Sequence, residues 1–380
     1  MAKRRSKKLR RPFERLTDDL ILEILSRLPV KSLNRCKCVS KTWENLISDH
    51  NNRSKLPQTL AGFLYSSINP ERSPLFALHF TNVSDSEIGF PLILPTFNFL
   101  PKYETISLLD CCNGLLLCRW HGDSAEYGFH YVVFNPATKK WCALPHSSQA
   151  GKMCTARLGF DAAVSSHFHV FEFALDDDRD GDSFVEVYSS KTGRWVHSED
   201  GWYDDISFIR DESATVFLNG RLHFLTIDDN EVVVVDTEGK VMANIPVPDV
   251  LDCSFIQQSQ GCLHFASFDK FENRLSVYVL EDYDSQEWIL KHSVRTAKIF
   301  RGRYMEIREI FQWVAIHPDS NLFFFTVGRE EETTLMSYDM NRQHAKLIRS
   351  LGLGSGYGQK FQPPYLPYVP SYLELPALHI

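Results

Sequence analysis

The sequence lacks the features of a membrane protein or a disulfide-stabilised protein. No apolar run approaches the roughly 18 residues that a membrane span needs, and the N-terminus has no apolar stretch typical of a signal peptide. The nine cysteines include no C-x-x-C pair and no zinc-ligand spacing. We therefore expect a soluble protein with reduced thiols and no metal or other cofactor, located in the cytoplasm, the nucleus or both.

Motifs for catalysis are also missing. The chain contains no G-x-S-x-G, P-loop or H-E-x-x-H motif, and no cysteine has an evident histidine partner in the sequence. The net charge of −7 gives no reason to expect nucleic acid as the main partner. These absences predict that the protein is not an enzyme.

Aromatic residues, in contrast, are abundant. They make up 13% of the 380 residues, with 27 Phe and 14 Tyr, and they favour strands because their rings fit a pleated, half-buried surface. A hydrophobic content of 43% can fill the core of one small and one large domain. We expect the larger domain to be mainly β.

The first eleven residues form a basic segment. It contains Lys3, Arg4, Arg5, Lys7, Lys8, Arg10 and Arg11. Such a run repels itself and does not fold alone. Two interpretations stay open: a nuclear localisation signal or contact with an anionic surface, and a solvated disordered tail.

Residues 16–47 have the periodicity of three short helices. The first carries an apolar stripe of Leu20, Ile21, Ile24, Leu25 and Leu28. Thr17 can cap this helix, and Pro29 can end it and begin the next. The second helix has an apolar face of Val30, Leu33, Cys36 and Val39, and the third, capped by Ser40, carries Trp43, Leu46 and Ile47. So small a unit cannot bury all this apolar surface, so part of it faces a partner or the rest of the same chain.

The order L-x-D-D-L-x-x-E-I-L-x-R-L-P-V-K-S-L, which continues to Trp43, resembles the F-box, especially in plant families. One departure is Thr17, where the family usually has Pro, and both residues suit the start of a helix. The resemblance implies that residues 12–50 form an F-box that inserts into a Skp-type adaptor. The implied adaptor contacts are Leu16, Leu20, Ile24, Leu28, Pro29, Val30 and Leu33. Residues 51–60 are then a linker.

A pattern recurs five times in the remaining chain, residues 61–378. It comprises a turn with Gly or Asn, an apolar strand, a polar loop, a second strand and a further turn, which a Trp follows in three copies. The copies begin near Asn113, His167, Asn219, Gly261 and Asn321, roughly 45 to 55 residues apart, which is typical of four-stranded propeller blades of the kelch kind. Residues 62–80 and 365–375 can pair to close the ring, because an open array would leave unpaired strand edges. We expect a β-propeller of about six blades.

Three short segments in this part resemble the F-box-associated domain of plant F-box proteins. They are Cys112-Asn113-Gly114-Leu115-Leu116-Leu117, the turn from Asn135 through Pro136 to Trp141 with Leu144-Pro145, and Tyr368-Val369-Pro370-Ser371-Tyr372-Leu373. The resemblance implies a propeller-like domain that recruits a target protein. An α+β form with fewer blades stays open.

Several residues have a chemical and a structural interpretation. Residues 176–182 place Asp, Asp, Asp and Gly as a calcium loop does, but position 12 is Val187 where a bidentate Glu is needed, so we expect a solvated loop. His167 and His169 have the spacing of a metal pair on a strand, without a third ligand nearby. His223 and His264 occupy equivalent positions in two repeats, which favours packing. Trp141, Trp195 and Trp288 are predicted to pack between blades and to need a partner for the indole N–H.

Taken with the resemblance, these features predict a substrate-recognition subunit of an SCF-type (Skp–cullin–F-box) E3 ubiquitin ligase. Its partners would be a Skp-type adaptor, through it the cullin and RING subunits, and a target protein held by the β domain. A ligand-sensing or lectin-like receptor is an alternative. An enzyme with a site in the propeller channel is a third, less favoured possibility.

Overall fold

The computed structural model describes two compact units, Met1–Pro57 and Gln58–Ile380. The described residues are 16–28, 30–49, 52, 56, 60–68, 76–83, 106–120, 129–148, 154–162, 164–174, 184–198, 215–226, 231–248, 253–283, 285–300, 302, 310–329, 332–350, 360–371, 375 and 377. The basic segment 1–11 and the Asp-rich segment 176–182 lie outside them. The boundary between the units falls within residues 51–60, the segment predicted as a linker.

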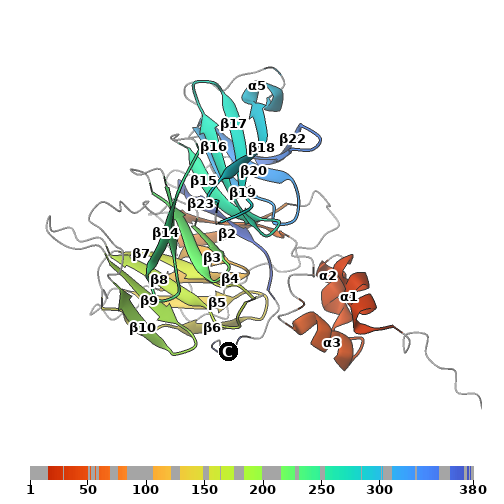
Figure 1. Ribbon diagram of the computed structural model, residues 1–380, viewed down its shortest axis with the longest axis vertical. Coiled ribbons are helices and arrows are strands. Elements are labelled where there is room, and N and C mark those ends of the chain that lie inside the picture. The colour runs from red at the N-terminus through yellow and green to blue at the C-terminus, as the bar shows by residue number, and fades with distance from the viewer. Residues whose placement is uncertain are drawn as a thin grey trace, which may run out of the picture. The chain divides into compact units, whose positions relative to one another are not determined.

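The first unit contains the three predicted helices. They are α1 (Asp18–Ser26), α2 (Val30–Cys36) and α3 (Lys41–Ser48) (Figure 1). Thr17 caps α1 through its backbone alone, because its carbonyl accepts the Ile21 N–H at 3.0 Å while its hydroxyl makes no capping bond. Ser40 caps α3 as predicted, since its Oγ accepts the Trp43 N–H at 3.2 Å.

The described residues of the second unit form antiparallel strands and one short helix. The strands of its first half are β1 (Gly62–Ile68), β2 (Phe76–Asn82), β3 (Ile106–Cys112), β4 (Leu115–Trp120), β5 (His130–Asn135), β6 (Lys140–Ala143), β7 (Thr155–Gly159), β8 (His169–Ala174), β9 (Phe184–Ser189), β10 (Arg194–Ser198), β11 (Thr215–Leu218) and β12 (Arg221–Leu225). The rest are β13 (Glu231–Val235), β14 (Val241–Pro246), β15 (Ser254–Ser259), β16 (Cys262–Asp269), β17 (Arg274–Leu280), β18 (Trp288–Arg295), β19 (Ile310–Ile316), β20 (Leu322–Arg329), β21 (Glu332–Asp339), β22 (His344–Ser350) and β23 (Lys360–Tyr368), with the helix α5 (Thr296–Ile299) after β18.

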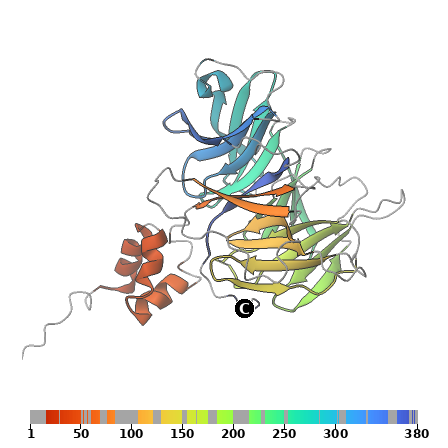
Figure 2. The same ribbon diagram turned by 180° about the vertical axis from the view of Figure 1, so that it is seen from behind.

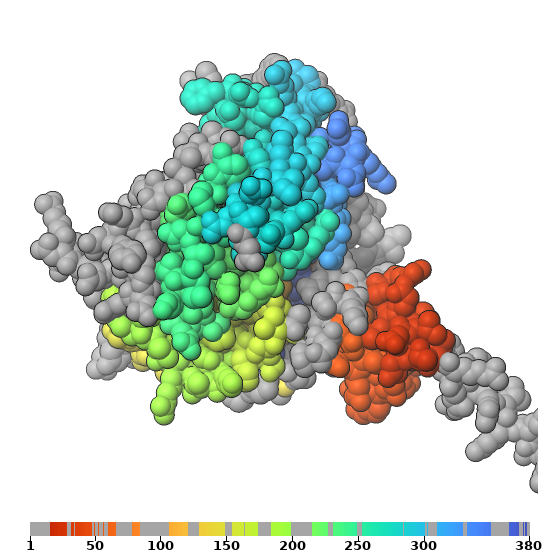
Figure 3. All heavy atoms as spheres, in the orientation of Figure 1, coloured from red at the N-terminus to blue at the C-terminus, as the bar shows by residue number. Residues whose placement is uncertain are grey.

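These strands form six sheets, which are the blades of a β-propeller. Five blades have four consecutive strands each, from β3–β6 to β19–β22, and the sixth has the order β2-β1-β23. Neighbouring blades follow the chain around the ring, which is visible as the change from yellow through green to cyan in Figure 3. The prediction of about six blades is confirmed.

The ring closes by pairing the two ends of the unit. β23 runs antiparallel to β1, with Gly62 opposite Tyr368, and it contacts both β19 and β3 (Figure 2). Strands from the two segments predicted to close the ring, 62–80 and 365–375, therefore pair with each other, over residues 62–68 and 360–368. Closure removes the two open sheet faces that a linear array of blades would leave at its ends.

The turns between the first and second strands of three blades follow one local rule. Asn113, Asn219 and Gln260 have φ of 47°, 53° and 51°, and the glycine after each also has positive φ. Two consecutive residues with positive φ make the type I′ turn, whose twist matches that of the flanking strands. Asn-Gly is therefore a strong local signal for these hairpins.

The three segments that resemble the F-box-associated domain meet in space. A Cβ on Gly114 would lie 2.6 Å from the Ser371 backbone N and 2.6 Å from the Val369 O, so the chain after β23 packs directly on this turn. The Asn135 side chain donates its Nδ2–H to the Ser371 O at 2.9 Å. The segments thus share one structural task, which is to fasten the C-terminal strand to the neighbouring blade.

Apolar side chains fill the spaces between blades, and tryptophans connect the outer strands. Trp195 on β10 donates its indole N–H to the Pro145 O after β6, and Trp288 on β18 donates to the Pro246 O of β14, both at 2.8 Å. Each bond joins a blade to the one before it. The predicted role in blade packing, with a partner for the N–H, is confirmed for these two residues. Trp141 is half-buried and packs in the cluster around Phe134.

Candidate functional site

Four apolar residues at intervals of four form a row along α1 and its two ends. They are Leu16, Leu20, Ile24 and Leu28, and we call this row the α1 ridge. Side chains four residues apart lie on the same face of a helix. Leu20 is 51% exposed and Ile24 is 44% exposed, while Leu16 and Leu28 are half-buried. The unit therefore presents large aliphatic side chains to solvent.

Behind the α1 ridge lies a compact core, against which Leu16 and Leu28 partly pack. It consists of Ile21, Leu22, Leu25, Leu33, Ile47 and Leu56, none more than 7% exposed. The apolar stripe predicted as one face is thus divided, with Ile21 and Leu25 facing the core and Leu20 and Ile24 facing solvent. At 100° per residue the stripe spans about 140°, which is wide enough to serve two surfaces. Leu56, predicted as linker, belongs to this core.

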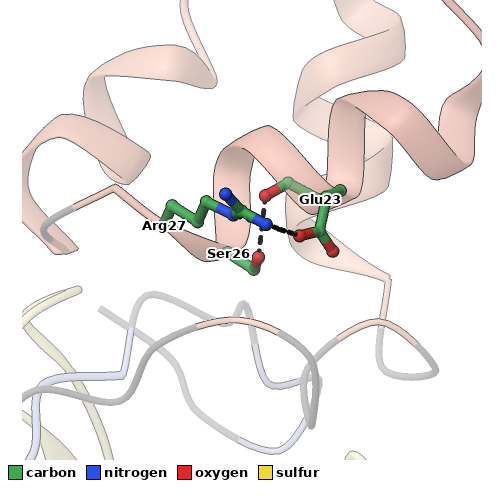
Figure 4. Close-up of polar contacts among 3 residues, drawn as sticks. All are labelled: Glu23, Ser26 and Arg27. Atoms are coloured by element: carbon green, nitrogen blue, oxygen red, sulfur yellow. Dashed lines mark hydrogen bonds and ion pairs between the residues drawn. The ribbon is translucent and has the colours of Figure 1, made fainter.

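A charged row borders the α1 ridge on the side away from the core. Arg27 and Glu23, one turn apart, form an ion pair in which Arg27 Nε donates to Glu23 Oε1 at 3.0 Å (Figure 4). Ser26 Oγ also donates to the Glu23 backbone O, at 2.9 Å. Both charged side chains are well exposed, so the pair stabilises the helix by only about 0.3 to 0.5 kcal/mol. Its greater effect is to place polar groups along one side of the apolar row, as at the rim of a protein interface.

The seven residues predicted as adaptor contacts do not all share this surface. Four of them are the α1 ridge. Pro29 lies outside the described residues, and Val30 begins α2 with a side chain that the structure does not describe. Leu33 is 2% exposed and packs in the core, because α2 turns this side chain toward α1. Leu33 therefore supports the surface from within the unit, and its contact with an adaptor stays a prediction.

Val39 was predicted on the apolar face of the second helix, and the structure places it after the end of that helix. α2 ends at Cys36, and Val39 follows in a turn where it is 62% exposed. The signal for this was present in Ser40. As the N-cap of α3, Ser40 has an extended backbone, so the preceding helix must end before it.

The propeller has a second concentration of ionisable side chains, between the blades β3–β6 and β7–β10. Glu172 and Glu186 lie opposite each other on β8 and β9, and they are 1% and 4% exposed. Tyr131 donates its hydroxyl to Glu172 Oε1 at 2.7 Å, and the Ser148 N–H donates to Glu186 Oε2 at 2.9 Å. Burial raises the pKa of Glu172, and the nearby Glu186 raises it further. Both bonds cross from one blade to the next, so this cluster stabilises the ring.

The two equivalent histidines, His223 and His264, are satisfied inside the fold. His223 Nδ1–H donates to the Val216 O at 3.1 Å, which leaves Nε2 to accept the Tyr283 hydroxyl at 2.8 Å. His264 lies 3.2 Å from both the Cys262 O and Lys291 Nζ. Burial lowers the pKa of each imidazole to about 4. These contacts support the packing role predicted for both.

His167 and His169 are the candidate metal pair. Each has a buried Nδ1 without a hydrogen bond in the described structure, and burial lowers the pKa of His169 to about 4. Among the described residues no group of three or more His, Cys, Asp or Glu side chains is placed to hold a metal ion.

Among the helices that the structure describes, none has the length and apolar character for a membrane span.

The family follows from comparison with known proteins. The profile of the F-box associated beta propeller domain matches residues 71–375, and the profile of the F-box domain matches residues 13–55. The chain belongs to the F-box-associated β-propeller family. F-box domains in general bind Skp-type adaptors, and F-box proteins are in general adaptors without catalytic activity.

Several F-box proteins from Arabidopsis thaliana are similar to this chain over most of its length. F-box protein At5g07610 is 28% identical over 347 residues, which cover 84% of this chain and 79% of the relative. F-box protein At5g49610 is 24% identical over 299 residues, covering 73% and 78% of the two chains. F-box protein At3g07870 is 25% identical over 321 residues, covering 75% and 73%. The chain is thus a plant F-box protein with a C-terminal propeller.

Proposed function

We propose that this protein is the substrate-recognition subunit of an SCF-type E3 ubiquitin ligase. The α1 ridge is the observation that supports adaptor docking, because it exposes aliphatic side chains beside a polar border on a rigid helical core. Covering Leu20 and Ile24 would contribute about 1 kcal/mol each, given that about half of each side chain is exposed. The propeller provides the separate surface on which a target protein is held.

The mechanism is proximity. The adaptor connects the F-box to the cullin and RING subunits, and the propeller holds the target near the ubiquitin-loaded conjugating enzyme. Tethering raises the effective concentration of target lysines at that enzyme. The chemistry of ubiquitin transfer belongs to the other subunits, and this chain acts by binding alone.

Replacing Leu20 and Ile24 together by Asp tests the docking surface. Two carboxylates in the centre of an apolar contact would have to be desolvated, so we expect the affinity for a purified Skp-type adaptor to fall at least about 100-fold in calorimetry. The matched control is Val196→Asp with Met242→Asp, which adds the same charge at propeller side chains that are 51% and 47% exposed. Leu33→Asp is unsuitable because it would disrupt the core.

The control variant should bind as the unchanged protein does, and both variants should keep the same circular dichroism spectrum. Equal adaptor affinity of the Leu20→Asp, Ile24→Asp protein and the control would contradict the proposal.

We further propose that the protein occurs in the cytoplasm and the nucleus, with the basic segment 1–11 directing entry to the nucleus. The seven Lys and Arg residues of this segment support the proposal. Replacing all seven by Gln in a fluorescent fusion is expected to confine the protein to the cytoplasm. An unchanged distribution under the microscope would contradict a role in import.

A further inference from the structure

One aromatic side chain of the propeller lies almost entirely in solvent. Phe271, at the tip of the β16–β17 hairpin, is 95% exposed, whereas the next most exposed large apolar side chain of the described residues, Val39, is 62% exposed. Monomeric proteins commonly expose single apolar residues in part. A phenylalanine that makes almost no contact with its own chain is a different case, since its ring is available in full to a partner.

The turn that carries Phe271 is held firmly. Asp269 Oδ1 accepts the N–H groups of Phe271 and Glu272, at 2.8 and 3.0 Å. Asn273 closes the turn with φ of 52° and donates its Nδ2–H to the Lys270 O. The Asn273 O in turn accepts the Thr296 N–H at 2.7 Å, which fixes the tip to the start of α5, at the same end of the blade (Figure 1). Because its backbone is already ordered, the turn loses little conformational entropy on binding.

The turn does not itself require an aromatic residue. Three other hairpins of the propeller have the same turn. In each, an Asn, Ser or Asp side chain accepts the backbone N–H of the residue two positions later, and the residue four positions later has a positive φ. At the position of Phe271 these turns have Ala137, Lys191 and Asn341. The fold thus accepts small, charged and polar residues at this position, so the ring of Phe271 has no local structural purpose.

Charge around the ring indicates the chemistry of a partner. Glu272 is neutralised by Arg274, with an N···O separation of 2.9 Å. Lys270 makes no ion pair with any described residue and is exposed. The tip therefore presents an apolar ring beside one free ammonium group. The complementary surface is an apolar pocket with a carboxylate at its edge.

The topology gives the Phe271 turn a distinct location. It connects the second and third strands of its blade, whereas the three comparable turns connect third and fourth strands. Because consecutive strands are antiparallel, the two kinds of connection lie at opposite ends of the blades. The segments that connect one blade to the next lie at the same end of the blades as the Phe271 turn.

We propose that the Phe271 turn, residues 269–273, is a contact point for the target protein, with the Phe271 ring inserted into an apolar pocket bordered by an acidic residue. This rests on the proposed function as a target receptor. A folded protein fits better than a membrane, because stable attachment to a lipid surface needs several apolar or basic groups together and this tip offers one of each.

Site-specific photo-cross-linking tests the proposal in the full chain bound to its adaptor. Benzoylphenylalanine is placed at position 271, and at position 341 as the control in the comparable turn. In plant extract with the proteasome inhibited, we expect a protein adduct at position 271 that is absent at position 341. The cross-linked protein is then purified and its affinity for the variants is measured.

Phe271→Ser is expected to weaken that affinity about 30-fold, as for a central interface residue, while Asn341→Ser leaves it within about twofold. Lys270→Glu is expected to weaken it as well, because it places like charges together. All variants should retain adaptor binding, since the α1 ridge is unchanged. If the unmodified protein did not bind the adaptor, the proposed function would be contradicted. The cross-link at position 271 tests the contact with the target independently of that result.

Three results would overturn the inference. One is equal cross-linking at positions 271 and 341, and another is an adduct whose affinity is unaffected by Phe271→Ser. The third is sedimentation of the unmodified protein, but not of Phe271→Ser, with vesicles of phosphatidylserine and phosphatidylcholine, which would identify a lipid surface as the partner.

Discussion

Gly114 and Gly220 occupy equivalent hairpin turns, with φ of 87° and 74°, but only Gly114 is in close contact with another segment. Alanine at either position is strained by the positive φ, which costs about 1 kcal/mol. At Gly114 the new Cβ would also overlap the backbone of Val369 and Ser371, whereas nothing lies within 4 Å at Gly220. We expect Gly114→Ala to lower the free energy of unfolding in urea by at least about 2 kcal/mol more than Gly220→Ala. Equal losses would show that the C-terminal segment does not press on this turn.

Glu172 allows a prediction about pH. Burial raises its pKa in the folded state above the unfolded value, so the folded state favours the protonated carboxyl. The resulting stability is present below the unfolded pKa and is lost as the pH rises through the folded pKa. Glu172→Gln imitates the protonated form and can still accept the Tyr131 hydroxyl. We therefore expect the melting temperature of the unmodified protein, relative to Glu172→Gln, to fall as the pH is raised from 4 to 8. A difference in melting temperature that stays constant with pH would contradict the raised pKa of Glu172.

At the scale of the element, α1 shows which part of the site could be predicted from the sequence. Apolar periodicity predicted the helix, and the family resemblance selected Leu20 and Ile24, which are exposed. Periodicity alone could not separate Leu20 and Ile24 from Ile21 and Leu25, because four aliphatic residues within one wide stripe are chemically alike. Which of them face the core depends on α2 and α3, whose packing angles are not written in the local pattern. The burial of Leu33 depends on the same packing.

The strands were easier to predict because their signals are local. Asn113-Gly114 and Asn219-Gly220 fix hairpins by backbone conformation alone, and the recurring tryptophans indicate the outer strands. The exposed position of Phe271 was not predicted, because a Phe between two strands reads equally well as part of either. Its exposure follows from the Phe271 turn. Hydrogen bonds to the Asp269 side chain hold this turn, and hydrophobicity does not reveal them.

Outer strands depend on their tryptophans to different extents. Trp195 and Trp141 are both half-buried and sit opposite the next-to-last residue of the preceding strand, but only Trp195 has an indole hydrogen bond among the described residues. We expect Trp195→Phe to reduce the free energy of unfolding by about 1 kcal/mol more than Trp141→Phe, since it also leaves the Pro145 carbonyl without its donor. Equal effects in urea denaturation would indicate that ring packing alone joins the blades.

At the scale of the whole molecule, the two units differ in what their integrity requires. The helical unit has its own core, to which Leu56 contributes, and the propeller begins with Leu60, which packs with Phe63. The propeller depends on a strand from the far end of the chain, because β23 pairs with β1 and contacts two other blades. Removal of the C-terminal strand should therefore destabilise the propeller far more than removal of the N-terminal helical unit.

Two truncations test this difference. Deleting residues 360–380 removes β23 and with it Tyr368, Ser371 and Leu375, which are buried against neighbouring blades. We expect this chain to lose its cooperative thermal transition and to aggregate, because β1 becomes an exposed edge and the blades that begin with β3 and β19 lose their contact with β23. Deleting residues 1–57 removes only the helical unit, so the propeller should melt within about 2 °C of its temperature in the full chain. Calorimetry with size-exclusion chromatography measures both, and a monomeric, cooperatively melting protein without residues 360–380 would show that ring closure is not what stabilises the propeller.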